Sequence, residues 1–343
     1  MKNAKEIFKN PVLLCVMKRF ARYIITVFLA FTISFFFFRS IPGNPIRRFL
    51  EVLRYRYGIY STEDQVLIAE YERIFGLEGD LFTQYLNYMR ELLLNWNMGP
   101  SYVNFPTPSQ VLIMRALPWT IGLLALATII AWALGNVLGS VAGWKRGSKI
   151  DEVLTPIALV TSQIPYYILA LLLVLVFGYY LGVLPTRGAF DPRATNLMEF
   201  IWSVIVHGTL PALSIVIVAA CGWTISMRSL LVSVLREDYI LFARAKGLKD
   251  GYIWRKYALR NVLLPQVTGL AMSLGFVVNG TYIVEYLFTY PGIGRLFVTA
   301  LNLLDYNTVQ GIVLTSIVSV LTAMLLIDLI YPLVDPRIKA LGR

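Results

Sequence analysis

Few residues of this sequence belong to the types that carry out enzymatic chemistry. His207 is the only histidine, and no other residue stands at a spacing that would make it a metal ligand or acid–base partner. Cys15 and Cys221 lie too far apart in the predicted organisation to form a disulfide. The chain has no Gly-x-x-x-x-Gly-Lys-Ser/Thr phosphate loop and no Gly-x-Ser-x-Gly or His-Glu-x-x-His motif. We therefore expect no catalytic residue, no metal site and no cofactor; ATP and Mg²⁺, if used, would be bound by another chain.

Apolar stretches between clusters of charge predict a membrane protein instead. Apolar residues make up 57% of the 343 residues and charged residues only 15%, whereas about a quarter of a soluble domain is charged. Roughly 20 apolar residues in a helix cross a bilayer, and a helix pairs its own backbone groups in lipid. Six stretches qualify, at residues 20–38, 117–144, 153–184, 200–227, 262–284 and 306–327. The predicted fold is all-α, a polytopic membrane protein with six transmembrane helices.

The positions of Lys and Arg predict the orientation of these helices. Alternate segments, beginning with the N-terminus, hold many basic residues, whereas the two short loops on the other side hold only Arg187, Arg193 and Arg295. By the positive-inside rule both termini are cytoplasmic. The first stretch follows a basic segment, as a signal peptide does, but no small-residue cleavage site comes after it. We expect it to remain as a membrane anchor.

The same reasoning divides the chain into five parts. Residues 1–19 form a cytoplasmic arm, 20–40 the first transmembrane helix, 41–114 an extracytoplasmic helical region, and 334–343 a cytoplasmic tail. Residues 115–333 form a five-helix core that contains a long cytoplasmic loop, 228–265. In the outer region, residues 61–64 resemble a helix N-cap, Gly76 is a stop signal, and a second helix is expected over residues 82–94.

Small and polar residues inside the apolar stretches suggest how the helices pack. Gly135, Gly139 and Gly143 form a ridge that favours close helix packing, with a pore-lining hinge as the alternative. The ionisable residues Glu285 and Asp328 lie near helix ends, which favours structural or gating roles over an ion pathway. Several aromatic residues are candidates for a translocation path, with packing and lipid-facing roles left open: Trp132, Tyr166, Tyr167, Trp223 and Tyr282.

The loop at residues 228–265 is the most informative segment of the sequence. Residues 228–246 are expected to continue the fourth helix, residues 247–251 to break it, and a second helix to run from Tyr252 towards Pro265. On that helix the apolar and the basic residues fall on opposite sides; the apolar set is Ile253, Trp254, Tyr257 and Ala258, and the basic set is Arg255, Lys256 and Arg260. Periodicity alone fits either a helix lying on anionic lipid or a protein-docking surface.

Residues 237–248 (Glu-Asp-Tyr-Ile-Leu-Phe-Ala-Arg-Ala-Lys-Gly-Leu) and 257–265 closely resemble the EAA loop of ABC importer permeases. The resemblance is to the dipeptide/oligopeptide/nickel branch. Five further segments resemble the same family in order, at residues 41–45, 182–188, 207–213, 285–294 and 328–337. The resemblance therefore covers nearly the whole chain.

The resemblance implies the type I ABC importer permease fold and a role as one half of a translocation pathway. In that family the EAA loop inserts into a groove on a cytoplasmic ATPase. The residues that it implies for ATPase coupling here are Glu237, Asp238, Ala243, Arg244, Ala245, Gly247, Leu248 and Tyr257. Pro291 and Gly292, in the segment after the fifth helix, join Glu285 and Asp328 as structural or gating candidates.

The implied partners are a second related permease, two cytoplasmic ATPase subunits and an extracytoplasmic solute-binding protein. The implied location is the inner membrane of a prokaryote, and the implied solutes are peptides, with oligosaccharides or nickel as alternatives. A stand-alone secondary transporter or channel is the alternative function, and a membrane enzyme is less well supported.

The sequence also departs from the family pattern at particular positions. Tyr257 stands where many members have His, and Asn44 where many have Asp. The segment Asn95-Trp-Asn-Met-Gly99 replaces the usual Gly-Asp-x-Gly, and residues 47–60 look like additional sequence. Most of these departures lie in the outer region, which is expected to meet the solute-binding protein.

Overall fold

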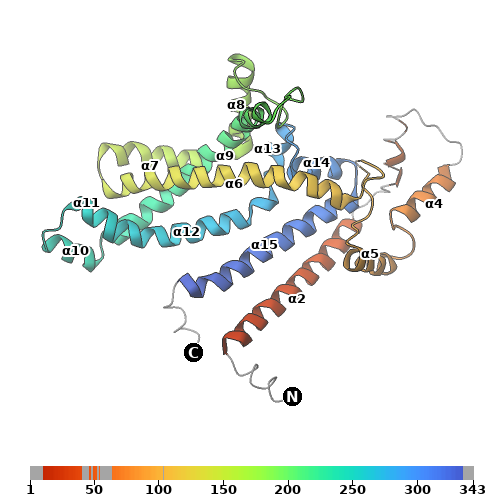
Figure 1. Cartoon of the computed structure of the whole chain (residues 1–343), viewed down its shortest axis with the longest axis horizontal. Coiled ribbons are helices and arrows are strands. Elements are labelled where there is room, and N and C mark those ends of the chain that lie inside the picture. The colour runs from red at the N-terminus through yellow and green to blue at the C-terminus, as the bar shows by residue number, and fades with distance from the viewer. Residues whose placement is uncertain are drawn as a thin grey trace. The chain divides into compact units, whose positions relative to one another are not determined.

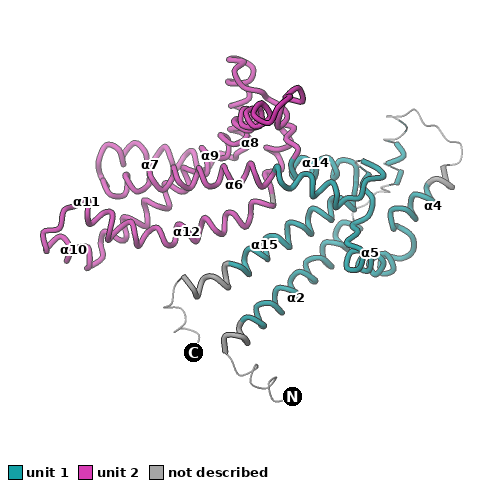
Figure 2. The backbone as a smooth tube through the Cα atoms, in the orientation of Figure 1, with its two compact units in different colours: residues 1–119, 292–343 teal, residues 120–291 magenta. Residues whose placement is uncertain are grey.

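The computed structural model describes residues 11–40, 46–47, 49–51, 54, 64–102 and 104–334. The described part is mostly helical, and its one pairing of extended segments is an isolated bridge between Pro100 and Pro108. It forms two compact units, coloured separately in Figure 2: residues 1–119 with 292–343, and residues 120–291. The chain passes between the units within helix α6 (Ser109–Trp144) and after Pro291.

The first unit contains the two ends of the chain and the outer region. Its helices are α2 (Pro11–Arg39), α4 (Asp64–Ile74), α5 (Leu81–Asn95), α14 (Ile293–Asn302) and α15 (Tyr306–Val334). Helices α2 and α15 run side by side (Figure 1), and the Tyr23 and Thr322 hydroxyls are 3.0 Å apart between them. Asp305, at the start of α15, accepts hydrogen bonds from Ser101 Oγ at 2.5 Å and from the Tyr102 backbone N–H at 2.8 Å.

The second unit contains most of the core and the long loop. It comprises part of α6 with α7 (Lys149–Ser162), α8 (Tyr166–Leu173), the π-helix η1 (Val174–Tyr180), α9 (Leu197–Val234), α10 (Asp238–Ala245), α11 (Asp250–Tyr252), the π-helix η2 (Ile253–Ala258), α12 (Leu259–Gly275), the 3₁₀ turn η3 (Val277–Asn279) and α13 (Tyr282–Leu287). In Figure 1, α6, α7, α9 and α12 run along one another and end near α10 and α11.

The all-helical fold predicted from the sequence is confirmed, but the six spans are not all continuous helices. Among the described residues, four helices are long and apolar enough to cross a membrane: α2, α6, α9 and α15. The third predicted stretch is instead a pair, α7 followed by α8 and η1, bent by 100°. Pro165 lies at the bend and explains it, because proline lacks an N–H and disfavours helix in the residue before it.

The fifth predicted stretch is also interrupted. Helix α12 ends at Gly275, and α13 begins only at Tyr282, after Gly280 adopts a φ of +71°. A positive φ of this kind favours glycine, and here it ends the short η3 turn that follows α12. The count of six transmembrane helices remains a prediction.

In the outer region, two sequence expectations agree with the structure. Helix α4 ends at Ile74, just before Gly76 with a φ of +66°, and α5 covers the second predicted helix. The N-cap predicted at residues 61–64 and most of the additional segment 47–60 lie outside the described residues.

The glycine ridge of α6 packs directly against α9. A Cβ atom built on Gly135 would lie 2.5 Å from the Ala220 carbonyl oxygen, and one on Gly139 would lie 2.4 Å from the Thr224 carbonyl oxygen. The ridge therefore brings two backbones together at distances that no side chain permits. Of the two roles considered for the ridge, close packing is the one that the structure shows.

The ridge can be tested by adding one methyl group. Gly139→Ala places a Cβ against the Thr224 carbonyl oxygen and Met227 Cβ, so we expect it to lower the unfolding free energy by about 1–3 kcal/mol. Gly122→Ala is the matched control, since its Cβ would meet nothing within 4 Å. Thermal unfolding of the purified chains measures the difference; equal midpoints for the two variants would contradict this packing.

Candidate functional site

The long loop is closed by a glycine-dependent turn at the end of α10. Gly247 has a φ of +72°, its N–H donates to the Arg244 carbonyl at 2.9 Å, and the Leu248 N–H donates to the Ala243 carbonyl at 3.3 Å. These two bonds are those of a Schellman motif, which ends a helix and reverses the chain. The break that the sequence predicted at residue 247 is confirmed, and the second helix starts slightly earlier, at Asp250.

The first half of the loop differs from the continuous helix that the sequence predicts. Helix α9 ends at Val234, and a separate helix, α10, begins at Asp238. The reason is burial: Ile240 is fully buried in a cluster with Met227 and Leu231 of α9. A straight extension of α9 would carry Ile240 away from these residues and into water.

The same cluster fixes the second half of the loop. Ile253 and Ala258 are fully buried in it, and the exposed Arg255 and Lys256 lie on the other side of the helix. The two-sided helix predicted from periodicity is therefore confirmed. Trp254 adds a ring contact with Trp144 of α6, with centroids 6.3 Å apart.

The predicted coupling residues divide into an inner and an outer set. Ala243 is buried in the cluster, and Leu248 and Tyr257 pack against it. The outer set is exposed; it consists of Glu237, Asp238, Arg244, Ala245 and Gly247. A Cβ on Gly247 would meet nothing within 4 Å, so the turn has open space in front of it.

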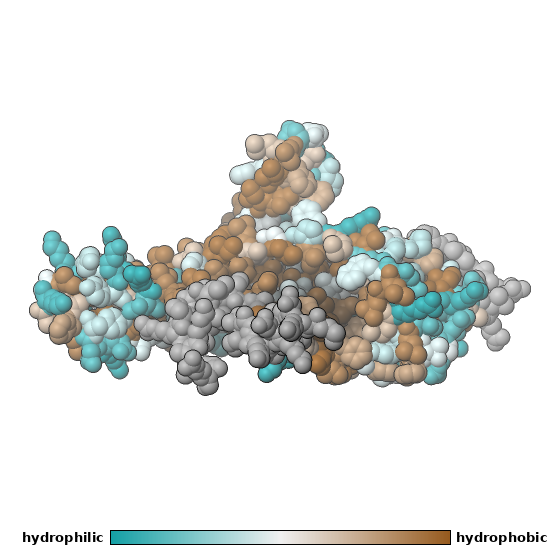
Figure 3. All heavy atoms as spheres, turned by 60° about the horizontal axis from the view of Figure 1, so that its bottom comes forward, coloured by the Kyte–Doolittle hydropathy of each residue, from teal (hydrophilic) through white to brown (hydrophobic). Residues whose placement is uncertain are grey.

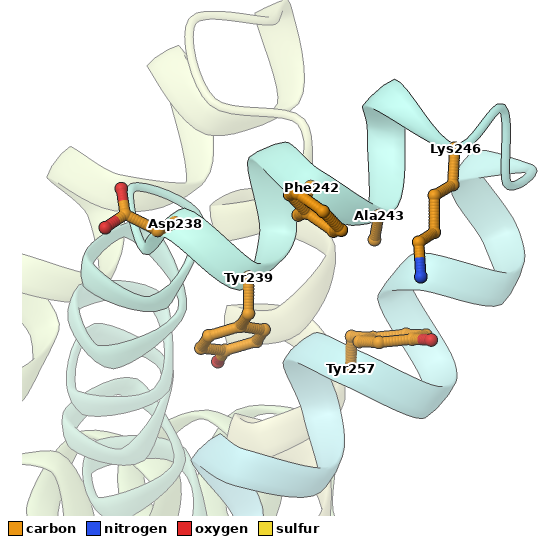
Figure 4. A pocket seen from close by; sticks show the side chains of 6 residues that line it. All are labelled: Asp238, Tyr239, Phe242, Ala243, Lys246 and Tyr257. Carbon is orange, nitrogen blue, oxygen red and sulfur yellow. The ribbon is translucent and has the colours of Figure 1, made fainter.

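A pocket of about 350 Å³ lies between α10 and η2, as Figure 4 shows. Three of its lining residues were predicted from the sequence, Asp238, Ala243 and Tyr257. The other three were not; they are Tyr239, Phe242 and Lys246. Asp238 points away from the remaining five side chains in the figure.

The unpredicted residues give this pocket an apolar and aromatic character. The Phe242 side chain is 66% exposed, and Lys246 Nζ lies 5.2 Å from the centre of its ring. The Tyr239 hydroxyl accepts a hydrogen bond from Asn261 Nδ2 at 2.8 Å. Hydrophilic side chains surround the α10–α11 end of the unit (Figure 3). Exposed aromatic residues within a polar surface are typical of a protein-docking site.

An ion pair connects the base of this loop to the turn between α6 and α7. Arg228, near the end of α9, donates to both carboxylate oxygens of Asp151, at 2.5 and 2.8 Å. Asp151 is 5% exposed and also accepts from the Gly147 N–H at 3.0 Å and from Thr155 Oγ1 at 2.8 Å. Sequence reasoning missed this pair because its members lie 77 positions apart.

The second unit also contains a cavity of about 510 Å³ in the apolar core. Of the predicted path residues, Tyr166 and Trp223 line it. Trp132 instead donates from Nε1 to the Gln266 carbonyl at 3.0 Å. Tyr167 is 38% exposed and Tyr282 is partly buried, and neither lines the cavity.

Beside these aromatic residues, the part of the lining that the structure describes presents hydroxyl groups and no charged side chain. The hydroxyl-bearing residues include Thr128, Ser162, Ser226 and Ser273. Sequence reasoning missed them because single serines and threonines in apolar helices carry no distinctive pattern.

The four structural or gating candidates predicted from the sequence are Glu285, Pro291, Gly292 and Asp328. Glu285 is fully buried, and its carboxylate accepts from Thr120 Oγ1 at 3.0 and 3.2 Å. Burial and the nearby Glu285 carboxylate raise the pKa of Tyr290 to about 12. Gly292 is the buried N-cap of α14, and Pro291 precedes it. The side chain of Asp328 lies outside the described residues.

The only histidine of the sequence has a structural hydrogen-bond partner. His207 donates from Nδ1 to the Ser203 carbonyl at 2.8 Å, one helical turn earlier in α9. Within the described residues, no cluster of His, Cys, Asp and Glu has metal-binding geometry.

The long apolar helices and the folded polar loop define a multi-pass helical membrane protein. Residues 135–340 match the family described as the binding-protein-dependent transport system inner membrane component. The matched segment covers more than half of the chain and includes the loop, the ion pair and most of the residues that line the cavity. The chain belongs to this family, and its fold is the type I permease fold of ABC importers.

Relatives align over nearly the full length. The oligopeptide transport system permease protein AppB of Bacillus subtilis is 32% identical over 92% of this chain and 96% of the relative. The dipeptide transport system permease protein DppB of Bacillus subtilis is 29% identical over 94% and 97%. The glutathione transport system permease protein GsiC of Salmonella choleraesuis is 31% identical over 94% and 98%. This chain is thus an ABC importer permease, a membrane component that works with ATPase and binding-protein partners.

The turn at Gly247 can be tested against a second glycine of the same loop. Gly247→Ala forces a side chain into the left-handed region, so we expect it to lower the unfolding free energy by about 1 kcal/mol. Gly251→Ala is the control: Gly251 lies in helical α11 with open space around it, so alanine should be neutral or slightly stabilising. Thermal unfolding of both variants measures the difference, and an equal or smaller loss for Gly247→Ala would contradict the Schellman turn.

Proposed function

We propose that this chain forms half of the translocation pathway of an ATP-driven peptide importer and docks onto a cytoplasmic ATPase through the turn at residues 243–248 of the long loop. We take the substrate class from the relatives, because their names specify oligopeptides, dipeptides and glutathione. The observation that carries the docking role is the loop itself. It forms a folded helix–turn–helix whose turn is exposed and whose inner face is held by its own apolar cluster.

The loop is connected to the long helices of the second unit by packing and by an ion pair. Its inner residues pack on α9, and the Arg228–Asp151 pair links α9 to the turn between α6 and α7. A force applied at Gly247 therefore reaches α9 and the α6–α7 turn through packed contacts. Small residues at the turn, Ala245 and Gly247, allow close approach of an ATPase groove. Movement of the ATPase subunits would then shift the population between two states of the cavity.

The cavity has a lining that suits a peptide. Hydroxyl groups can exchange hydrogen bonds with peptide N–H and C=O groups of any sequence, and aromatic rings supply apolar contact. Among the described residues no charged side chain lines it, so a solute would not be held tightly at one point. We assign Tyr166 and Trp223 to the path and infer that a second, related permease chain completes it.

The complete importer contains further partners in this proposal. Two ATPase subunits bind and hydrolyse ATP with Mg²⁺, so this chain is a non-catalytic subunit with no cofactor of its own. An extracytoplasmic solute-binding protein delivers the peptide. The excess of Lys and Arg in the termini and the long loop supports cytoplasmic termini in a prokaryotic inner membrane.

The docking role predicts that charge at the turn uncouples the importer. In Gly247→Asp the aspartate tolerates the left-handed backbone, but its carboxylate enters the contact with the ATPase. We expect peptide uptake to fall at least tenfold while the ATPase subunits still hydrolyse ATP. Gly251→Asp is the control, because it adds the same charge four residues away at an exposed position of normal φ. Uptake and ATP hydrolysis in reconstituted vesicles measure both effects.

Two outcomes would count against this role. Normal uptake by Gly247→Asp would show that the turn makes no essential contact. Equal loss in both variants would show that charge anywhere on the loop disturbs transport, as expected for a surface lying on lipid.

A further inference from the structure

A cavity of about 280 Å³ in the first unit has no assigned role. It lies at the C-terminal end of α2, against α5 and the segment that follows it. Its polar lining residues include Arg39, Arg73, Asn87, Tyr88, Glu91 and Asn97. Under the proposed orientation this cavity is on the extracytoplasmic side, where the binding protein arrives.

Arg39 is a cation held in place with an unused donor. Its Nη1 donates to Gln84 Oε1 at 2.6 Å, and its guanidinium lies 5.2 Å from the centre of the Phe35 ring. Gln84 is itself fixed, because its Nε2 donates to the Leu77 carbonyl at 2.8 Å and the Gly79 carbonyl at 3.1 Å. Arg39 Nε is buried and has no hydrogen-bond partner among the described residues. A buried, unsatisfied donor on a charged group is unfavourable unless something else satisfies it.

The lining contains a second buried donor, and two of its acceptors are already engaged. The Tyr88 hydroxyl is buried without a partner in the described structure, and burial raises its pKa, so it remains a donor. Two acceptors are already engaged: Asn97 Oδ1 accepts from the Gly99 N–H at 3.0 Å, and Glu91 Oε2 accepts from Asn95 Nδ2 at 3.0 Å. Two arginines and one glutamate leave the lining with a positive balance.

Asn97 is also a position at which this chain departs from the Gly-Asp-x-Gly pattern. An aspartate here would place a carboxylate in the lining of the cavity that contains Arg39. The asparagine supplies no charge, so the cation has no carboxylate partner from this segment.

We propose that this cavity is a socket for an acidic side chain, Asp or Glu, of the extracytoplasmic solute-binding protein, with Arg39 as the residue that pairs with it. The proposal rests on the proposed function, which supplies the binding protein. A carboxylate in the cavity would pair with the Arg39 guanidinium and would neutralise the excess positive charge of the lining.

The strength of one such pair favours a carboxylate carried by a protein over a free one. A charge-assisted pair changes an affinity by about tenfold to a hundredfold. That is too little to retain a small free acid at ordinary concentrations, but it is a substantial share of a transient protein contact. The cavity is large enough for a side chain and too small for a folded segment.

The test measures binding-protein affinity for the full complex in nanodiscs, with three variants of this chain. Arg39→Gln removes the cation, and Asn97→Asp supplies an internal carboxylate; we expect each to weaken binding about tenfold or more and to reduce its dependence on salt. Arg90→Gln is the control, because Arg90 lies on the same α5 helix, exposed and outside the cavity. It should leave the affinity within about twofold of the original.

Thermal unfolding of the same complexes separates docking from folding. Asn97→Asp should keep or raise the stability while it weakens docking, a combination that a purely structural Arg39 would not produce. Unchanged affinity in Asn97→Asp and Arg39→Gln would overturn the socket while leaving the proposed function intact. Failure of the binding protein to bind the unmodified complex would instead contradict the proposed function.

Discussion

The contact between the glycine ridge of α6 and the backbone of α9 is the constraint on which the second unit depends. Gly135 and Gly139 allow α6 to approach carbonyl groups of α9 at distances that exclude any side chain, and Gly143 makes a tight contact beside the Arg228 carbonyl oxygen. This contact sets the position of α9, which carries Arg228 and the residues that bury the loop. Replacing one glycine would therefore disturb the loop as well as the helix pair.

The contact between α6 and α9 determines where the loop, its turn and the cavity lie in the second unit. Because α9 is fixed against α6, Met227 and Leu231 present an apolar surface at its end, and Ile240 and Ile253 fold back onto that surface. The Schellman turn at Gly247 then stands exposed in front of the folded loop. On the other side, α9 contributes Trp223 and Ser226 to the cavity. One helix thus connects the proposed docking turn with the proposed path.

Local signals in the sequence predicted much of this arrangement. Apolar length identified the helices α2, α6, α9 and α15, and the glycines predicted both the ridge and the break at residue 247. No glycine or proline marks the break after Val234. The break arises because Ile240 is buried against Met227 and Leu231 of α9, a tertiary contact that has no local signal in the sequence. The Asp151–Arg228 pair and the Arg39 cavity depend on contacts between distant segments, which a single sequence does not reveal. Pro165 lies within the third predicted stretch, but apolar length, from which that stretch was predicted, is insensitive to the bend that this proline causes.

The central claim is that the exposed turn of the loop contacts an ATP-hydrolysing subunit. Site-specific photo-crosslinking in the intact complex tests it most directly, with the photoreactive residue at position 245 and, for comparison, at the exposed position 93 of α5. The account predicts that position 245 forms a covalent adduct with an ATPase subunit and that position 93 does not. Adducts of position 245 with lipid alone, or with no protein partner, would contradict it.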